Sequence, residues 1–357
     1  VTNVYTGLIL NLTPDTVTLI SYPGELFMRT LKLLVLPFVI SCIIIGEHGV
    51  IKHSEKWEIA IRTLVYFFST SMLNVVIGMI LVLLIHPGSS GLKPHEHKPK
   101  GLKPQVSILD GFLDIGRCTP VCVGSIICGK IASIPDISSA LDRLAWFILT
   151  VLVALALYHF IIIQLIYFFF LRKNPFKYYV QLGPSLLTAF ATSSKAASLP
   201  ITFKVLEDEV KMNKRITRFV LPLGNLNLNG TAAFMTIGVI FIAQMNNMPL
   251  GIGDYVNLLI TVTFLSMSMA TIPSASLIII VMLCNIIHAP VEDVSLLFAV
   301  DWLLDRARTV NNILGDCYTI AVVQKLSEKE LAALEQVKSA SQTMARSVGS
   351  IIDISSS

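Results

Sequence analysis

The sequence predicts an all-α polytopic membrane protein, and three observations lead to this fold class. Charged residues make up only 14% of the chain, whereas roughly 25% is usual in a soluble domain. The hydrophobic set reaches 54% and the mean hydropathy is +0.72. Several uncharged runs approach the length of about 20 residues that a helix needs to cross a bilayer. These features exclude a soluble, a disordered or a disulfide-rich protein, and the net charge of +4 is too small to indicate nucleic-acid binding.

Three uncharged runs in the N-terminal half are candidates for membrane-spanning helices. They are Leu33 to Gly46, Thr63 to Ile85 and Leu144 to Leu171. The first follows Arg29 and Lys32, whose long side chains can reach the lipid headgroups. The second and third are long enough to cross a bilayer as single helices.

Two segments of the C-terminal half are predicted to have both ends on the same side of the membrane. Tyr178 to Ile201 contains the polar sequence TSSKAASLP and lies between Lys177 and Lys204. Tyr255 to Val291 contains MATIPSAS, and neither of its flanks carries Lys or Arg. Basic flanks stay in the cytoplasm, so the ends of the first segment are expected inside and those of the second outside. Each segment is therefore predicted to form a re-entrant helical hairpin with a polar tip.

The segment between the hairpins, Phe219 to Phe241, is predicted to be a broken span. Its apolar sequence is interrupted by GNLNLNGT, in which Asn225, Asn227 and Asn229 precede Gly230. Carbonyl groups freed by unwound backbone inside a membrane are the usual cation ligands of secondary transporters. Two hairpins that enter from opposite faces also indicate an inverted repeat.

The last apolar span, Ser295 to Val323, carries a stripe of polar side chains. At 100° per residue, five of them fall within a sector about 80° wide. Charges inside a membrane cost about 2.5–3.5 kcal/mol each, so the stripe costs on the order of 10 kcal/mol without compensation. A soluble amphipathic helix or an internal Asp305–Arg308 ion pair is the simpler alternative, but neither needs all five residues in line. The five are Asp301, Asp305, Arg308, Asn312 and Asp316.

The stripe is interpreted as a site for a charged solute and for cations. The planar guanidinium group of Arg308 suits a carboxylate. Asp305 suits an ammonium group, and Asp316 with Asn312 suits a hard cation such as sodium. An arginine and an aspartate together are complementary to an amino acid with an additional carboxylate.

At this point the residues resemble the sodium-coupled glutamate/neutral amino acid transporter family, whose members include excitatory amino acid transporters and dicarboxylate/amino acid:cation symporters. The resemblance extends from about residue 22 to 330, and its last motif is long and specific. The matching stretches are YPGELFMR (Tyr22–Arg29), VIGMILVLLIHPG (Val76–Gly88), LPITFK (Leu199–Lys204), KRITRFVLP (Lys214–Pro222), FIAQMNN (Phe241–Asn247) and AVDWLLDRARTVNNILGD (Ala299–Asp316).

The resemblance implies a glutamate-transporter-like fold with two re-entrant hairpins and a broken transmembrane helix, in a multi-pass protein of the plasma membrane. It implies Na+ as a co-transported ion, no organic cofactor, and a homotrimer where the scaffold is intact. It divides the chain into a partial scaffold region (1–62), a transport-core helix (63–86), a loop with a remnant of scaffold (87–143), the transport core (144–326) and a cytoplasmic tail (327–357).

The resemblance also assigns roles to individual residues. The aspartate that matches Asp305 holds the substrate amino group, and the arginine that matches Arg308 holds the side-chain carboxylate, which indicates glutamate or aspartate. Further substrate contacts match Ser194, Thr231, Ile272, Thr309 and Asn312. One sodium site matches Gly224, Asn227, Asn312 and Asp316, a second matches Thr70 and Ser71, and Ser266 lies near a third.

The sequence departs from the family pattern at several of these positions. Lys195 stands where a small hydroxyl is expected, and its ammonium group is predicted to occupy the substrate cavity or to pair with Asp305. Most of the first span, the fourth span and half of the fifth are absent, which indicates a truncated or degenerate member. Further departures are Asn229 for an aspartate, Phe67 for a tyrosine, Met235 for a glutamate that couples protons and potassium, and Ser268, Thr271 and Ser276 for glycines of the second hairpin.

Three functions remain open from the sequence. The stripe favours a sodium-coupled secondary active transporter of acidic amino acids such as glutamate and aspartate. Lys195, Asn229 and the missing scaffold favour a non-transporting family member or a regulatory subunit. An anion channel is a third alternative, since Lys195 could attract anions. The sequence contains no nucleophile–base pair, phosphate loop or metal cluster that would indicate an enzyme, and His159 is interpreted as a packed side chain.

Overall fold

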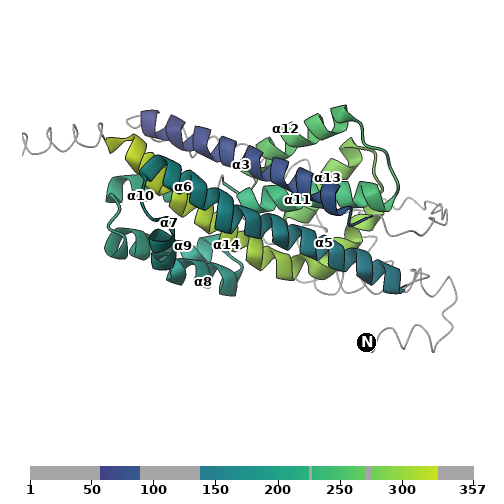
Figure 1. Cartoon of the computed structure of the whole chain (residues 1–357), viewed down its shortest axis with the longest axis horizontal. Helices are drawn as coiled ribbons and strands as arrows, with labels where there is room; N and C mark the ends of the chain where they lie inside the picture. Colours follow the sequence, from purple (N-terminus) through teal and green to yellow (C-terminus); the bar gives the residue numbers. More distant parts are fainter. Residues whose placement is uncertain (1–56, 89–136, 225–226, 270–274, 329–357) are drawn as a thin grey trace, which may run out of the picture.

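The computed structural model describes residues 57–88, 137–224, 227–269 and 275–328 (Figure 1). All regular secondary structure in these ranges is helical, as predicted. The expected span Leu33–Gly46 and most of the loop and tail lie outside them. In chain order the elements are α3 (Trp57–Ile85), α5 (Ile137–Leu157), η2 (Tyr158–Ile162), α6 (Ile163–Leu171), α7 (Pro175–Gln181), α8 (Gly183–Thr192), α9 (Lys195–Lys204), η3 (Val205–Glu209), α10 (Lys214–Leu223), α11 (Asn229–Met245), α12 (Ile252–Ser268), α13 (Ala275–Ile286), η5 (Val291–Val294) and α14 (Ser295–Leu326).

Helix α11 lies at the centre of the helical bundle. All of its residues from Asn229 to Ala243 are buried, and it packs against α3, α5, α12, α13 and α14. In Figure 1, α3, the rod formed by α5 and α6, and α14 run along the long axis of the molecule around it. A helix that is apolar on all sides is expected at such a position. The polar residues at the start of α11 are consequently placed in the protein interior.

Two described helices are long and apolar enough to cross a membrane, Glu58–Ile85 and Leu141–Leu171. They coincide with two of the predicted spans. The outer surface of α5, η2 and α6 carries a continuous series of exposed large apolar side chains, which suits contact with lipid rather than water. The series contains Trp146, Leu149, Phe160, Leu165, Phe168 and Phe169.

The π-helical turn η2 joins α5 to α6 without interrupting the rod. Two consecutive residues of this turn, Tyr158 and His159, are both buried. Turns of this kind change the direction of side chains within a helix and occur frequently at functional sites. Here the turn directs Tyr158 towards the start of α11 and His159 towards α14 and α7, as their hydrogen bonds show.

Helices α8 and α9 pack against each other and correspond to the first predicted hairpin. Ser193 reverses the chain with a left-handed backbone (φ 51°). Ser194 then caps α9 by accepting a hydrogen bond from the Ala197 N–H. Helix α8 lies against α14, where Arg306 donates hydrogen bonds to carbonyl groups at the end of α8. The helix–turn–helix arrangement agrees with the prediction, while its re-entrant position in a membrane stays a prediction.

The connection from α9 to α10 is held by an ion pair on the protein surface. Arg218 donates hydrogen bonds of 2.9 and 3.0 Å to the two carboxylate oxygens of Glu207 in η3. These bonds and the positive charge of Arg218 lower the pKa of Glu207 below its usual value, so the carboxylate is charged at neutral pH. The pair joins the end of the first hairpin to the start of α10.

Helix α10 ends at Leu223 and α11 begins at Asn229, within the predicted broken span. Gly224, Asn227 and Leu228 lie between the two helices, and residues 225–226 are outside the described ranges. A similar gap, residues 270–274, separates α12 from α13 in the second predicted hairpin. The C-terminal end of α10 leaves backbone carbonyl groups without helical partners, whereas the start of α11 leaves N–H groups. Gly224 and Asn227 lie in this connection, and the Gly224 carbonyl accepts a hydrogen bond from the Asn227 N–H at 2.8 Å.

Candidate solute and cation sites

The guanidinium group of Arg308 is fully enclosed in the protein, with only 1% of the residue exposed. Its Nη2 nitrogen donates hydrogen bonds to Asp301 at 2.6 Å and to Asp305 at 3.0 Å, both on the same helix, α14. Its Nη1 nitrogen donates to the Ser276 hydroxyl of α13 at 2.6 Å. The ion pair considered from the sequence is therefore present, but it is a cluster of two carboxylates and one arginine. The exposed fraction of the side chain is 23% for Asp305 and 5% for Asp301.

Two further features define the surroundings of Arg308. The carbon Cζ of its guanidinium group lies 4.0 Å from the centre of the Phe234 ring, which is a cation–π contact. The nitrogen Nε is buried and has no hydrogen-bond partner among the described residues. An arginine donor left open in an enclosed place is unusual, because a buried donor without a partner costs about 1–3 kcal/mol. The group is thus placed to bind an additional acceptor.

The first turn of α11 packs closely against α14 beside Arg308. A Cβ atom on Gly230 would lie 2.9 Å from the Arg308 carbonyl oxygen, so only glycine fits without a backbone shift. Asn312 accepts a hydrogen bond from the Gly230 N–H at 2.8 Å and donates one to the Thr231 hydroxyl at 3.2 Å. The Thr309 hydroxyl donates to the Asp305 carbonyl of its own helix. The predicted substrate contacts on α11 and α14 therefore lie together.

A second charged cluster surrounds Asp316, two turns further along α14. The Lys195 ammonium group lies 2.8 Å from Asp316 Oδ2, and the two side chains are 3% and 0% exposed. The ammonium also donates hydrogen bonds to the Asn227 carbonyl at 2.9 Å and to the Gly224 carbonyl. The sequence-based prediction that Lys195 pairs with Asp305 is therefore wrong, because its partner is Asp316. The alternative that its ammonium group occupies the substrate cavity stays a prediction.

The other oxygen of Asp316 is also bonded. Asn227 Nδ2 donates to Asp316 Oδ1 at 3.0 Å. Gly224 lies so close to the carboxylate that a Cβ atom would overlap it. Gly224, Asn227 and Asp316, expected at one sodium site, thus meet, but around an ammonium group of the protein. The Asn312 side chain, expected there too, bonds to α11 instead.

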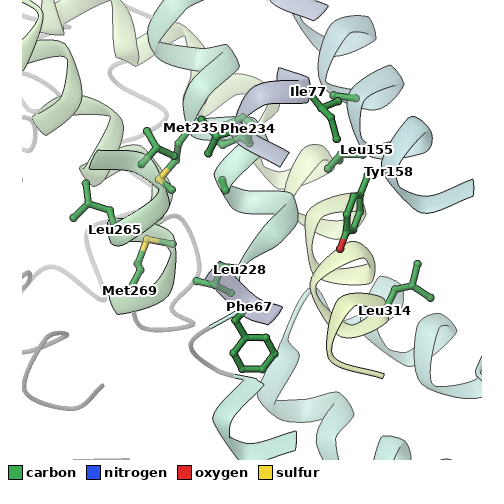
Figure 2. Close-up of a cluster of buried hydrophobic side chains, with 14 of the residues drawn as sticks. Phe67, Ile77, Leu155, Tyr158, Leu228, Phe234, Met235, Leu265, Met269 and Leu314 are labelled. Carbon is green, nitrogen blue, oxygen red and sulfur yellow. The ribbon is translucent and has the colours of Figure 1, made fainter. Parts of the chain in front are cut away.

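The residues expected at the second sodium site also meet, at the contact of α3 with α11. Asn229 Oδ1 accepts a hydrogen bond from the Ser71 hydroxyl at 3.0 Å, and Asn229 Nδ2 donates to the Tyr158 hydroxyl at 3.1 Å. Figure 2 shows the Tyr158 hydroxyl pointing from the α5–α6 rod towards this region. The Thr70 hydroxyl donates to the Tyr66 carbonyl within α3. Asn229 thus bonds the side chains of Ser71 and Tyr158, whereas Thr70 bonds only the backbone of α3, and Asn229 brings no charge to the group.

The remaining predicted site residues form no hydrogen bond with the two charged clusters or lie outside the described ranges. Ser194 is half-buried and caps α9. The Ser266 hydroxyl donates to the Thr263 carbonyl within α12. Ile272 lies outside the described ranges.

Sequence reasoning missed several residues of the two clusters. Asp301 lies on the stripe, yet no role in holding Arg308 was predicted for it. Ser276 was expected only as the replacement of a glycine, and no contact of Phe234 with Arg308 was predicted. Outside the two clusters, His159 is buried as interpreted from the sequence, and its Nδ1 lies 2.7 Å from Asn311 Oδ1 and its Nε2 2.9 Å from the Tyr179 hydroxyl. The position of Asp301 on the stripe was the one signal available.

Comparison with known proteins identifies the family to which the chain belongs. The model of the sodium:dicarboxylate symporter family matches residues 1–117 and 115–326. Excitatory amino acid transporter 2 of Mus musculus is 32% identical over 90% of this chain and 76% of its own length. The putative sodium-dependent excitatory amino acid transporter glt-6 of Caenorhabditis elegans is 31% identical over 90% and 77%. Excitatory amino acid transporter 3 of Mus musculus is 30% identical over 88% and 80%. The family resemblance of the motifs is thereby confirmed, and this chain belongs to the sodium:dicarboxylate symporter family, a family of membrane transporters.

Proposed function

We propose that this chain is a sodium-coupled carrier of acidic amino acids such as aspartate or glutamate. Arg308 binds the side-chain carboxylate of the solute, and Asp305 binds its amino group. The observation that supports this proposal is the fully enclosed Arg308 guanidinium group, whose Nε donor has no hydrogen-bond partner among the described residues. The family and its excitatory amino acid transporter members support the transport of such a solute with sodium.

In this proposal the contacts of Arg308 change when the solute binds. A carboxylate can accept two parallel hydrogen bonds from a guanidinium group through its two oxygen atoms. Asp301 and Asp305 each accept through one oxygen atom only. The solute carboxylate replaces Asp305 as an acceptor, and Asp305, the more exposed of the two aspartates, turns to the solute ammonium group. The solute site also includes the side chains of Thr309, Asn312 and Thr231.

The same proposal gives roles to the helices around the site. The pairs α8–α9 and α12–α13 act as re-entrant hairpins, and α10–α11 acts as a broken span. The hydrogen bond from Arg308 to Ser276 links α13 to the solute site, so α12–α13 is the gate. Sodium is co-transported near Ser266. A multi-pass position in the plasma membrane and a homotrimer remain predictions from the resemblance.

The test compares two arginines of α14 in the reconstituted full chain. Arg308→Cys removes the enclosed guanidinium group, whereas Arg306→Cys removes one that bonds the end of α8. Sodium-driven uptake of labelled aspartate into vesicles is expected to be lost in Arg308→Cys and kept in Arg306→Cys. Equal aspartate uptake by Arg308→Cys and the parent would contradict the role of Arg308. Binding of aspartate by the parent without any uptake would favour the non-transporting family member instead.

A further inference from the structure

We propose that the Lys195 ammonium group is a built-in cation that takes the place of a bound sodium ion at Asp316. The carrier therefore binds no sodium at this position, and fewer sodium ions accompany each solute. This inference rests on the proposed function only where it concerns the number of sodium ions transported with each solute. The occupancy of the site itself is a property of the folded chain and can be measured without transport.

The oxygen atoms around the ammonium group form a donor set for a hard cation. They are the carbonyl oxygens of Gly224 and Asn227, in the stretch between α10 and α11, and the carboxylate of Asp316. Carbonyl and carboxylate oxygens are the ligands that hard cations take in proteins. All three come from buried groups, since Asn227 and Asp316 are 0% exposed and Gly224 packs on the carboxylate.

Lys195 faces all three oxygen atoms of this donor set. A lysine ammonium group has three N–H donors and no acceptor. Its single positive charge balances the single negative charge of Asp316. Lys195 is the first residue of α9, so its side chain starts beside the turn of the first hairpin and extends to the α10–α11 connection.

A sodium ion cannot share this place with the ammonium group. The two cations would lie within a few ångströms of each other in an enclosed site, where like charges repel strongly because little water screens them. Both carboxylate oxygens already have a positively polarised neighbour, because Asn227 Nδ2 bonds Oδ1 and the Lys195 ammonium group lies 2.8 Å from Oδ2. The ammonium is also covalently attached, so no change in sodium concentration displaces it.

The neighbouring polar cluster does not provide a substitute sodium site. At the contact of α3 with α11, Asn229 bonds Ser71 and Tyr158, and it carries no charge. Sodium coupling is then left to the region near Ser266, on α12. The first hairpin, in contrast, is attached to α14 through Lys195 and Asp316 whether sodium is present or not.

The test measures how sodium changes the thermal stability of the purified full chain, in NaCl and in choline chloride at equal ionic strength. Lys195→Ser removes the ammonium group and leaves the three oxygen atoms open for sodium. The double variant Lys195→Ser/Asp316→Asn also removes the carboxylate. Lys204→Ser is the matched control, because it removes an exposed lysine from the same helix.

Lys195→Ser is expected to unfold at a lower temperature than the parent in choline, and to gain at least about 3 °C in sodium beyond the parent's own response. The double variant should lose this additional gain, and Lys204→Ser should behave as the parent. A Lys195→Ser chain without the additional gain would overturn the proposal.

The parent provides a second, independent comparison in case Lys195→Ser does not fold. Asp316→Asn and the double variant should show the same difference between sodium and choline as the parent, because sodium does not bind Asp316 when Lys195 is present. If sodium raised the unfolding temperature of the parent but not that of Asp316→Asn or of the double variant, the proposal would be overturned. Because no uptake is measured, failure of the aspartate transport experiment with these results intact would count against the proposed function alone.

Discussion

Arg308 has more negative charge beside it than it needs for neutrality. Asp301 and Asp305 both bond its Nη2 nitrogen, so the cluster of these three side chains carries a formal charge of about −1 when all are ionised. Such a cluster attracts the ammonium group of an amino acid but repels its carboxylates. Asp301, which is nearly fully buried, therefore competes with the solute for Arg308.

Replacing Asp301 by Asn should tighten the binding of aspartate several-fold, because the negative charge that competes for Arg308 is removed. The same change should lower the stability by about 1–3 kcal/mol, since a buried hydrogen bond to a charged group is weakened. Equilibrium binding of labelled aspartate and thermal unfolding measure the two effects. Asp142→Asn, at an exposed position of α5, is the control. Weaker aspartate binding by Asp301→Asn would show that Asp301 supports the solute site instead.

At the residue scale, the helical period predicted the stripe on α14 correctly but not the partners of its members. The angular positions depend only on the geometry of one helix, and the structure places the Asp301, Arg308 and Asp316 side chains in the interior. The partner of Lys195 depends on how α9 lies against the α10–α11 connection. Nothing in the local sequence fixes that arrangement, so the contact with Asp305 was predicted where the structure has Asp316.

At the element scale, the close approach of α11 to α14 holds both clusters in place. Gly230 lets the two backbones meet, and Asn312 then bonds the first turn of α11. The sequence predicted an interruption at GNLNLNGT, because three asparagines before a glycine do not continue an apolar helix, and α10 ends and α11 begins within this stretch. That the two helices form one broken membrane span stays a prediction. The sequence could not predict that Asn229 bonds both α3 and the α5–α6 rod, since those partners lie far away in the chain.

Gly230→Ala should separate α11 from α14 and destabilise the chain by about 1–3 kcal/mol, despite the better helix propensity of alanine. The new Cβ atom would lie 2.9 Å from a backbone oxygen, which cannot move alone. Gly238→Ala, on the same helix, is the control, because there the Cβ atom meets the end of the Ile280 side chain at 3.0 Å. The unfolding temperature and the affinity for aspartate should both decrease more in Gly230→Ala than in Gly238→Ala. Equal losses in the two variants would contradict the importance of this contact.

At the scale of the whole molecule, the all-helical class follows from composition and from the length of apolar runs. The two long spans and the helix pair α8–α9 were predicted from hydropathy and charged flanks. The central position of α11 was not, because its apolar surface fits a lipid-facing helix equally well. Only the packing of five other helices around it shows that it is enclosed.

Potassium should have no effect on transport by this chain. The position at which excitatory members of the family carry a coupling glutamate is occupied by Met235, which is fully buried. Met235 belongs to the same cluster of buried hydrophobic side chains as Leu265 and Met269 (Figure 2). A thioether neither titrates nor binds a hard cation well. Sodium-driven aspartate uptake, at clamped membrane potential, should be equal in vesicles loaded with potassium or with an impermeant organic cation. A clear dependence on internal potassium would indicate another carrier group, with Asp301 to be examined first.

The ion pair between Lys195 and Asp316 limits how far such a carrier could concentrate its solute. With an about tenfold sodium gradient and about 70 mV across the membrane, each co-transported sodium ion supplies about 3 kcal/mol. That free energy corresponds to a factor of about 150 in the ratio of internal to external solute. A cation that is part of the protein returns with it in every cycle and supplies none of this free energy. Transport with one sodium ion fewer would suit surroundings rich in the solute, where a shallow gradient is sufficient and each molecule imported dissipates less of the cell's sodium gradient.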